Sequence, residues 1–148
     1  MQKQGSSADI IIPTQSYGDE SCTRMYTRGK KLNLHKTNTK LSKEIELLLP
    51  KDLTVWKGPI VTCQAMLAET LADIKTWAKA GFLCVEMETS TLFAVSNHFK
   101  VPCAAAVYIS DNLVKGQTIG DEKHIEEKAK RRLVKDELFK SAIKAILS

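Results

Sequence analysis

Three carboxylates in the second half of the chain are the residues best suited to chemistry. Glu86 and Glu88 flank Met87 in a Glu-Met-Glu turn that follows an apolar segment, and Asp111 follows a second apolar segment. Carboxyl groups accept hydrogen bonds and exchange protons with bound molecules. An α/β protein builds its site by delivering such groups at the ends of strands. We therefore take this part of the chain as the candidate site.

A strand, a helix and a second strand are predicted to position these carboxylates. The strands are expected over Phe82–Val85 and Val101–Ile109, and the helix between them over Thr89–Phe99. The helix is predicted from apolar residues at helical spacing, namely Leu92, Val95 and Phe99. Parallel strands need a crossover connection, usually a helix, so we expect a βαβ unit.

The first part of the chain predicts one strand, one long loop and one helix. A short β-branched run over Ala8–Pro13 has the length of a buried strand. Thr14–Asn38 is rich in polar residues and is expected to be a loop. A cap at Asn38 or Thr39 would start a helix that ends at Leu49. The residues expected on its buried face are Leu41, Ile45, Leu48 and Leu49.

Three further elements complete the predicted fold. We expect a strand over Leu53–Cys63 that Gly58-Pro59 interrupts, a helix over Leu67–Ala80 that Gly81 stops, and a last helix over Asp121–Leu147. The apolar residues of the last helix are Ile125, Ala129, Leu133, Leu138, Ala142, Ile143 and Ile146. The fold class predicted from these elements is α/β, with a mixed central sheet flanked by helices.

Length and composition predict one globular domain over residues 1–148. With 43% apolar and 26% charged residues, a chain of 148 residues can bury about 70% of its unfolded surface. No apolar run approaches the ~18 residues of a membrane span, and the start lacks the apolar core of a secretory signal. We expect a cytoplasmic protein without membrane contact. The four cysteines form no C-x-x-C pair, which argues against disulfides and structural zinc.

The positive charge is concentrated in one segment. The chain carries 22 basic and 17 acidic residues, and residues 24–57 hold nine basic against three acidic side chains, a balance of +6. Such a segment can bind phosphate or nucleic acid, or can be an ordinary solvated face. Because no aromatic residues are interleaved as a stacking platform, we favour the solvated face over a nucleic-acid site.

The quoted segments together resemble a known family. Val85-Glu-Met-Glu88, the helix and strand after it, and Ser110-Asp111 look like the carboxyl-terminal portion of the nucleoside phosphorylases and nucleosidases. These include purine nucleoside phosphorylases, uridine phosphorylases, and methylthioadenosine or AMP nucleosidases. Asp9-Ile-Ile-Ile-Pro13 is similar to the family's central strand, and Val61-Thr62-Cys63-Gln64 lies about where the family has a strand that ends in Ser/Thr-x-Asp. The resemblance covers most of the chain.

The resemblance implies a separate role for each candidate residue around a bound nucleoside. Cleavage of the glycosidic bond passes through an oxocarbenium-like sugar, which needs hydroxyl anchors and an acid for the departing base. Glu88 would bind the ribose hydroxyls, Met87 would lie against the sugar, and Glu86 would support the turn. Asp111 would protonate the five-membered ring of a purine, positioned by Ser110. The base pocket would be lined by Thr62, Cys63 and Met66.

Each of these residues also fits a structural role when taken alone. A strand-ending Asp is often a cap, Glu at a helix start favours the helix dipole, and Met87 can be core packing. The combination in this chain order favours the site for Glu88 and Asp111. For Glu86, Met66 and Cys63 both interpretations stay open.

The chain also departs from the family pattern. Gln64 stands where the family usually has Asp, and Met66 stands where an aromatic residue would stack on the base. We expect no arginine to assist Asp111, with Lys123 or His124 as the nearest substitute. The Gln-x-Arg base clamp of the uridine enzymes has no counterpart in Thr62–Thr76. Purine is therefore the expected base.

The family's phosphate site lies upstream of the strand with which this chain begins. We expect a purine nucleoside phosphorylase-like glycosyl transfer with phosphate as co-substrate and no other cofactor or metal. The alternatives are a purine nucleosidase that uses water, and a degenerate subunit that binds nucleosides without turnover. The expected partners are a purine nucleoside, phosphate, and either further copies of the chain or a companion chain that supplies the missing amino-terminal half.

Overall fold

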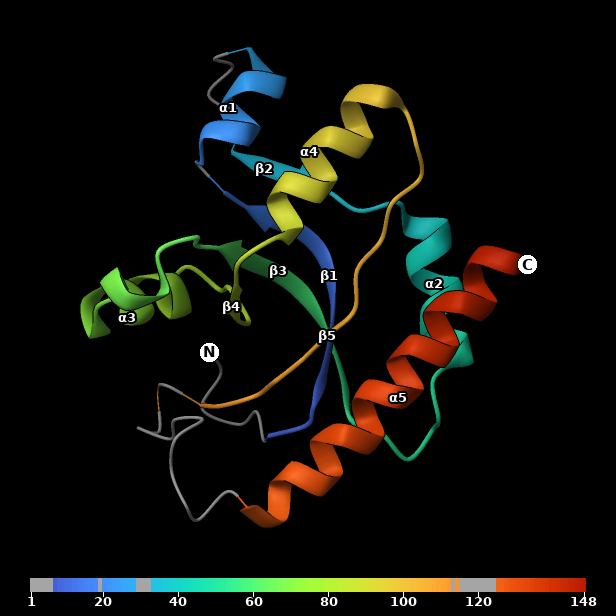
Figure 1. The fold of residues 1–148 in the computed structure, drawn as a ribbon. Coiled ribbons are helices and arrows are strands. Elements are labelled where there is room, and N and C mark those ends of the chain that lie inside the picture. Colours follow the sequence, from blue (N-terminus) through green and yellow to red (C-terminus); the bar gives the residue numbers. More distant parts are fainter. Residues whose placement is uncertain (1–6, 19, 29–32, 113, 115–124) are drawn as a thin grey trace.

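A mixed sheet flanked by helices forms the body of the molecule (Figure 1), which confirms the predicted fold class. The computed structural model describes residues 7–18, 20–28, 33–112, 114 and 125–148. The strands are β1 (Ile10–Tyr17), β2 (Leu34–Lys36), β3 (Val55–Thr62), β4 (Val85–Glu86) and β5 (Val107–Tyr108). The helices are α1 (Ser21–Thr27), α2 (Thr39–Leu48), α3 (Leu71–Lys79), α4 (Thr89–Phe99) and α5 (Ile125–Leu147), and Met66–Ala68 forms a 3-10 turn, η1.

The sheet combines a parallel centre with antiparallel neighbours. Its order is β2-β1-β3-β4, and β5 also pairs with β1. Strands β1, β3 and β4 run parallel, whereas β2 and β5 run antiparallel to β1. The predicted βαβ unit is therefore wrong, because α4 connects β4 to a strand that runs the other way and pairs with β1. The registered pairs Ile10 with Tyr108 and Ile11 with Val107 fix this direction.

The segment predicted as one polar loop contains regular structure. Strand β1 continues to Tyr17, and α1 and β2 follow within Thr14–Asn38. Polarity concealed the strand, since Ser16 is fully buried and its hydroxyl contacts the Thr62 hydroxyl at 2.9 Å. A periodicity of apolar residues cannot show a strand end that is buried through hydroxyl pairing.

Strand β3 is not interrupted where the sequence predicted a break. Gly58 pairs with Pro13 and Pro59 with Gln15, and the register shifts between Pro13 and Gln15. A Cβ at Gly58 would lie 2.8 Å from Cδ1 of Leu83. Glycine therefore lets the chain before β4 pack closely on β3.

The helix boundaries follow their caps. Asn38 caps α2 by accepting from Leu41 N at 2.9 Å, which confirms one of the two predicted caps. Helix α3 begins at Leu71 and not at Leu67, because Thr70 and Asp73 form a capping box. It ends before Gly81, whose φ of 91° is the conformation that glycine adopts at the end of a helix.

Helix α4 has the predicted bounds but faces differently from the prediction. Its buried residues are Thr89, Ser90, Phe93 and Ala94. Leu92 and Phe99 are exposed by 54% and 61%. Thr89 and Ser90 carry hydroxyls, so a pattern of apolar residues places them on the solvent-exposed face of the helix. Polar contacts at the first turn, described below, set the rotation of this helix.

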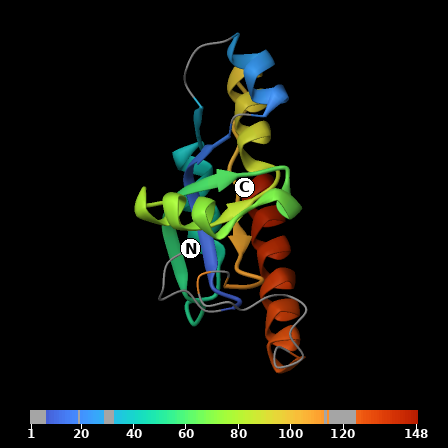
Figure 2. The same ribbon diagram turned by 90° about the vertical axis from the view of Figure 1, so that its left-hand side faces the viewer.

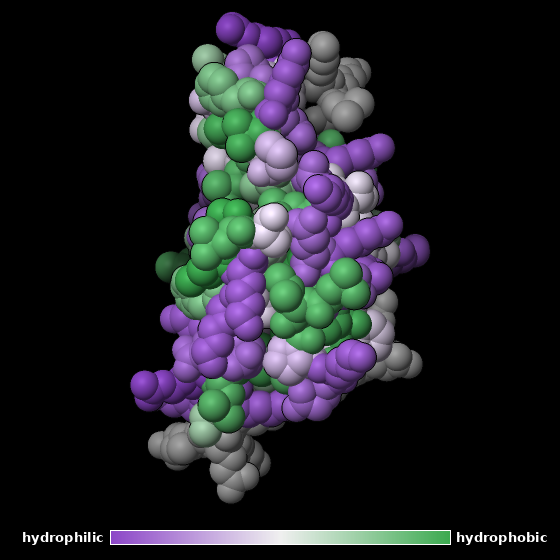
Figure 3. Space-filling view, turned by 90° about the vertical axis from the view of Figure 1, so that its right-hand side faces the viewer, coloured by the Kyte–Doolittle hydropathy of each residue, from purple (hydrophilic) through white to green (hydrophobic). Residues whose placement is uncertain are grey.

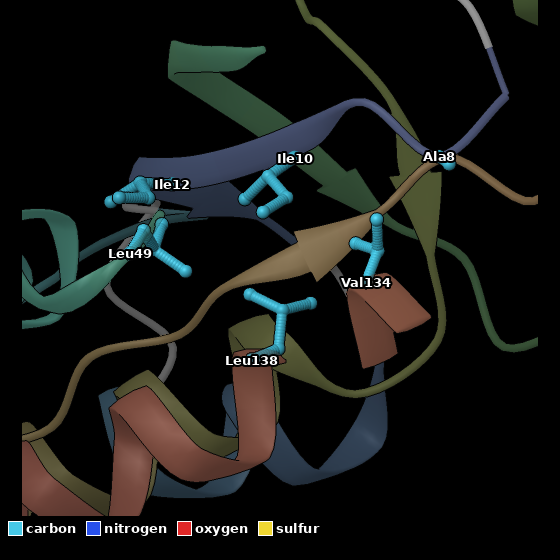
Figure 4. Close-up of a cluster of buried hydrophobic side chains, with 6 residues drawn as sticks. All are labelled: Ala8, Ile10, Ile12, Leu49, Val134 and Leu138. Carbon is cyan, nitrogen blue, oxygen red and sulfur yellow. The ribbon is translucent and has the colours of Figure 1, made fainter. Parts of the chain in front are cut away.

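One face of β1 packs against α5 and the end of α2. Ile10 and Ile12 cluster with Leu49, Val134 and Leu138, as Figure 4 shows. In Figure 2, α5 runs along one side of the sheet while α3 lies nearest the viewer. On the other face of the sheet, the buried cluster consists of Ile11, Ile60 and Leu83.

The buried face of α5 also differs from the prediction. Its buried residues are Val134, Leu138, Ser141 and Ala145. Of the predicted apolar set, Leu133 and Ile143 are exposed by 67% and 54%. Ser141 donates to Leu48 O at 3.1 Å, so small residues bring α5 close to α2. Figure 3 shows the resulting mixture of apolar and charged side chains on this side of the molecule.

Three sequence expectations involve parts of the chain that the structure describes only in part. The predicted start of the last helix, at Asp121 to His124, lies outside the described residues. Within the described ranges, no helix is both long and apolar enough to cross a membrane. In the basic segment, Lys57 pairs with Glu46 at 2.9 Å and Lys40 with Glu44 at 3.8 Å.

Candidate active site

A small cavity lies between β4 and the segment that carries Ser110 and Asp111. Its walls come from Ile11, from residues 84–86 and from residues 107–112. Its volume is about 80 Å³, well below the roughly 300–1,000 Å³ of typical ligand sites. The cavity brings Glu86, Ser110 and Asp111 to one space, but by its size it can hold only part of a nucleoside.

The two ends of this cavity belong to different ends of the sheet. Glu86 pairs with Thr62 at the carboxyl end of β3. Asp111 follows β5, which is antiparallel to β1, and the Ile109 N–H donates to Asp9 O at 2.8 Å beside the start of β1. The carboxylates therefore approach the cavity from opposite directions along the strands.

The Asp111 carboxylate is oriented by its neighbour and, through the main chain, by α5. The Ser110 hydroxyl donates to Asp111 Oδ1 at 3.1 Å. Arg131 of α5 donates from Nη1 to Ser110 O at 2.9 Å and to Ser7 Oγ at 3.2 Å. An arginine therefore supports this segment through the Ser110 carbonyl, and the expectation that no arginine assists the Asp111 carboxylate itself stays a prediction. No sequence signal points to it, because Arg131 lies 20 positions after Asp111 in a run of basic residues.

Glu86 binds the first turn of α4. Its Oε2 accepts from Glu88 N at 2.8 Å, from Thr89 N at 2.7 Å and from Thr89 Oγ1 at 2.7 Å. Its Oε1 accepts from the Thr62 hydroxyl. The first N–H groups of a helix have no partner within the helix, and a carboxylate there also complements the helix dipole. Glu86 thus fixes where α4 begins.

Thr62 connects this turn to the strands. Its hydroxyl contacts Ser16 Oγ at 2.9 Å, accepts from Ser90 N at 2.8 Å and donates to Glu86. The side chain is only 6% exposed. All of these contacts lie within the protein, and Thr62 does not line the cavity. Its predicted place in the base pocket stays a prediction.

Met87 and Glu88 are exposed at the start of α4. Met87 is 37% exposed, and Glu88 is the N-cap residue but makes no capping bond with its side chain. Neither residue lines the cavity. The Glu88 carboxylate is therefore accessible from outside, as a group that binds sugar hydroxyls must be. That role is a prediction.

The loop after β3 adds a carboxylate that the sequence did not single out. Burial raises the pKa of Glu69, a hydrogen bond from Cys63 opposes this, and the negative charges of Asp111 and Asp73 raise it further. Glu69 is therefore close enough to Asp111 for the charge of Asp111 to affect the pKa of Glu69. Cys63 is half-buried, with its N–H donating to Glu86 O at 2.8 Å, and Met66 is 59% exposed in η1. Neither lines the cavity.

Other groups near the cavity have limited chemistry. Burial raises the pKa of the Cys84 thiol to about 12, so this cavity residue stays protonated at neutral pH. Among the residues the structure describes, no group of three or more His, Cys, Asp or Glu side chains could hold a metal ion. Lys123 and His124, the predicted assistants of Asp111, lie outside these residues.

Comparisons with known proteins agree on one family. The sequence model of the phosphorylase superfamily matches residues 1–148. A DeoD-type purine nucleoside phosphorylase from Alkaliphilus metalliredigens (strain QYMF) is 26% identical over 124 residues, 83% of this chain and 53% of the relative. Another from Geobacillus kaustophilus (strain HTA426) is 25% identical over 139 residues, 94% of this chain and 56% of the relative. The chain spans about half the length of the curated relatives it matches.

Proposed function

This chain belongs to the phosphorylase superfamily, and from that premise we propose that it binds a purine nucleoside and takes part in transfer of its sugar to phosphate. The observation that carries the proposal is the cavity between Glu86 and Asp111. The cavity is lined by Glu86, which binds the first turn of α4, and by Asp111, the proposed acid for the base. The names of the relatives, DeoD-type purine nucleoside phosphorylases, support purine as the base.

In this proposal Asp111 is the general acid. It donates a proton to the five-membered ring of the purine while the bond between that ring and C1′ of the sugar breaks, and the bonding electrons leave with the base. A phosphate oxygen then forms the new bond to C1′. Ser110 and Arg131 orient the Asp111 segment, through the contacts at 3.1 Å and 2.9 Å.

Glu88 binds the ribose hydroxyls in the same proposal, and Met87 lies against the sugar. Both are exposed at the first turn of α4, next to the turn that Glu86 fixes. Glu86 serves the site through this turn, since its two oxygens are occupied by the hydroxyl of Thr62 and by donors of the turn itself. Cys63 and Met66 approach the base from the loop after β3.

The remaining walls of the site come from outside the described residues. A cavity of about 80 Å³ does not enclose a nucleoside, and the chain covers 53% and 56% of the two relatives. We propose that further copies of the chain, or a companion segment equivalent to the rest of the relatives, complete the sugar and phosphate sites. No additional cofactor enters this reaction.

Product analysis tests the proposed reaction. The protein is incubated with inosine or adenosine, with and without phosphate, and the free base and the sugar product are quantified. Ribose 1-phosphate formed only with phosphate supports the phosphorylase, while free ribose without phosphate supports the nucleosidase alternative. We expect Asp111→Asn to lower kcat by roughly 10²–10⁴-fold and to leave inosine binding nearly unchanged. Equal turnover by both proteins rejects the role of Asp111.

The small volume of the cavity, about 80 Å³, supports a second candidate, a subunit that binds nucleosides without turnover. This candidate predicts that inosine raises the melting temperature by mass action, with no free base released at any phosphate concentration. Adding the companion half of a relative distinguishes a dormant enzyme from a binding protein, because only the former gains turnover.

A further inference from the structure

A second carboxylate, from a distant part of the chain, contacts the first turn of α4. Glu20 lies just before α1, and its Oε1 accepts from Ser90 Oγ at 2.9 Å and from Thr91 Oγ1 at 2.7 Å. Ser90 is fully buried. Two hydroxyls that converge on one carboxylate oxygen form a charge-assisted contact, which is stronger than a contact between neutral groups.

The chain around Glu20 is built for this close approach. A Cβ at Gly18 would lie 2.0 Å from Ser90 Oγ and 2.5 Å from Glu20 Oε2, so only glycine fits there. The Thr23 hydroxyl donates to Glu20 O at 2.9 Å and fixes the main chain at the start of α1. Glu20 therefore reaches α4 from a well-defined position.

The contact continues into the turn that carries Glu88. The Ser90 N–H donates to the Thr62 hydroxyl at 2.8 Å, and Thr62 in turn donates to Glu86. Glu86 accepts from the N–H of Glu88 at 2.8 Å. Glu20 and Glu86 thus bind the first turn of α4 from two sides, and the direction of the exposed Glu88 depends on both.

The second oxygen of Glu20 is buried and has no hydrogen-bond partner among the described residues. Among the described residues, Glu20 Oε2 and His35 Nε2 are buried side-chain atoms without a hydrogen-bond partner. His35 is 6% exposed, and burial lowers its pKa while the charge of Glu20 opposes that change. A buried polar atom without a partner costs stability, and a role at a site is one reason to retain it.

We propose that Glu20 is a positioning residue for the sugar of the nucleoside. By binding Ser90 and Thr91 it fixes the first turn of α4 so that the Glu88 carboxylate faces the ribose hydroxyls. This inference rests on the proposed function. It assigns sugar recognition partly to the segment before α1, and it predicts that Glu20 affects the affinity for a nucleoside but not for a free base.

The test compares the dissociation constants of inosine and hypoxanthine by calorimetry in four variants. Glu20→Ala removes the contact, Glu20→Gln keeps one acceptor oxygen, and Thr91→Val removes one donor with little change of shape. Glu137→Ala removes an exposed carboxylate of α5 and is the control. We expect Glu20→Ala to weaken inosine about 10-fold, as one or two lost charge-assisted contacts would, and hypoxanthine less than twofold.

Thr91→Val should fall between wild type and Glu20→Ala, and Glu20→Gln should recover most of the inosine affinity. An equal loss for inosine and hypoxanthine, or no loss, overturns the inference. Amide hydrogen exchange at residues 89–92 of the unliganded protein is measured in parallel. If wild type binds neither compound, the proposed function fails, and the sugar-positioning role fails with it. The exchange data then decide only whether Glu20 fixes the turn, which requires faster exchange in Glu20→Ala than in Glu137→Ala.

Discussion

The two ends of the candidate site are built in different ways. The α4 turn (residues 86–91) is fixed by a dense set of contacts among Thr62, Glu86, Ser90 and Glu20. Among the described residues, the Asp111 segment (residues 109–112) is held by main-chain contacts of Ile109 with Ala8 and Asp9 at 2.8 Å and by Arg131 at 2.9 Å. The α4 turn is held by side chains from β3, β4 and the segment before α1, and Glu20 and Ser90 lie 70 positions apart in the sequence. The placement of Asp111 depends on the docking of α5.

This difference matters for catalysis. A sugar-binding group must be in place before the reaction, and a rigid turn provides this at no further cost in entropy. The acid must also match the position of the departing base, and in this chain its segment is supported by Arg131 of α5. The following predictions test this contrast, beginning with the largest expected effect.

Replacing Glu86 should cause the largest loss of stability. Glu86→Ala leaves the Thr62 hydroxyl and the first donors of α4 without their acceptor, and we expect the free energy of unfolding to fall by about 3 kcal/mol. Glu86→Gln keeps one acceptor oxygen and should lose less than half as much. Urea denaturation measures both. If the two substitutions cost the same small amount, the α4 turn is not fixed as described.

Replacing Arg131 should affect the Asp111 segment more than the whole protein. Arg131→Ala removes the donor to Ser110 O, so we expect about 10-fold weaker binding of hypoxanthine, with a loss of only about 1 kcal/mol in unfolding free energy. Arg132→Ala is the matched control, because Arg132 is the exposed neighbour on the same helix. Calorimetry and urea denaturation separate the two effects. Identical behaviour of the two variants contradicts the role of Arg131.

The sequence predicted the parts of the fold that depend on local signals. The Asn38 cap of α2 and the stop glycine after α3 are local, and so are the bounds of α4, Thr89–Phe99, whereas the capping box that starts α3 at Leu71 was not predicted. The direction of β5 could not be predicted from the sequence. The helix after β4 can lead to a strand of either direction, because β5 pairs with β1 and not with β4. The buried faces of α4 and α5 include Ser90 and Ser141, which a pattern of apolar residues cannot show.

In the candidate site, too, the sequence indicated the residues that belong to a local motif and missed those that do not. The sequence indicated the Glu-Met-Glu turn and Ser110-Asp111 as candidate site residues because each motif is contiguous in the sequence. Arg131, Glu69 and Glu20 were not found, since each reaches the site from a separate element and none belongs to a motif. Long-range contacts of this kind carry no spacing that a single sequence displays.

The pH dependence of Glu69 reports on how close the loop after β3 lies to Asp111. Its pKa is raised from 4.5, mainly by burial, with the charge of Asp111 contributing. The folded state therefore favours the protonated form, and this contribution to stability is present below the ordinary pKa and lost as pH rises through the raised pKa. Wild type should be less stable than Glu69→Gln at neutral pH, and the difference should close below about pH 4.5.

The Asp111→Asn variant gives the corresponding control for Glu69. It removes one of the charges that raise the Glu69 pKa, so the NMR titration midpoint of the Glu69 carboxyl should move down toward its ordinary value. A midpoint that does not move would mean that the two carboxyls do not share one space. The loop after β3 would then not be the part of the protein that lies beside the Asp111 carboxylate.

The smallest expected effect concerns the chemical reactivity of Cys84, which lines the cavity. Because burial raises the pKa of Cys84 to about 12, its reactive thiolate is scarce at pH 8. We expect iodoacetamide to leave Cys84 unmodified in the native protein and to alkylate it in urea, as peptide mass spectrometry would show. Arg131→Ala should increase the native rate if loosening of the Asp111 segment opens the cavity, whereas Arg132→Ala should not. Rapid labelling of Cys84 in native wild type would mean that residues 107–112 do not cover this wall, and the contrast between the α4 turn and the Asp111 segment would lose its structural basis.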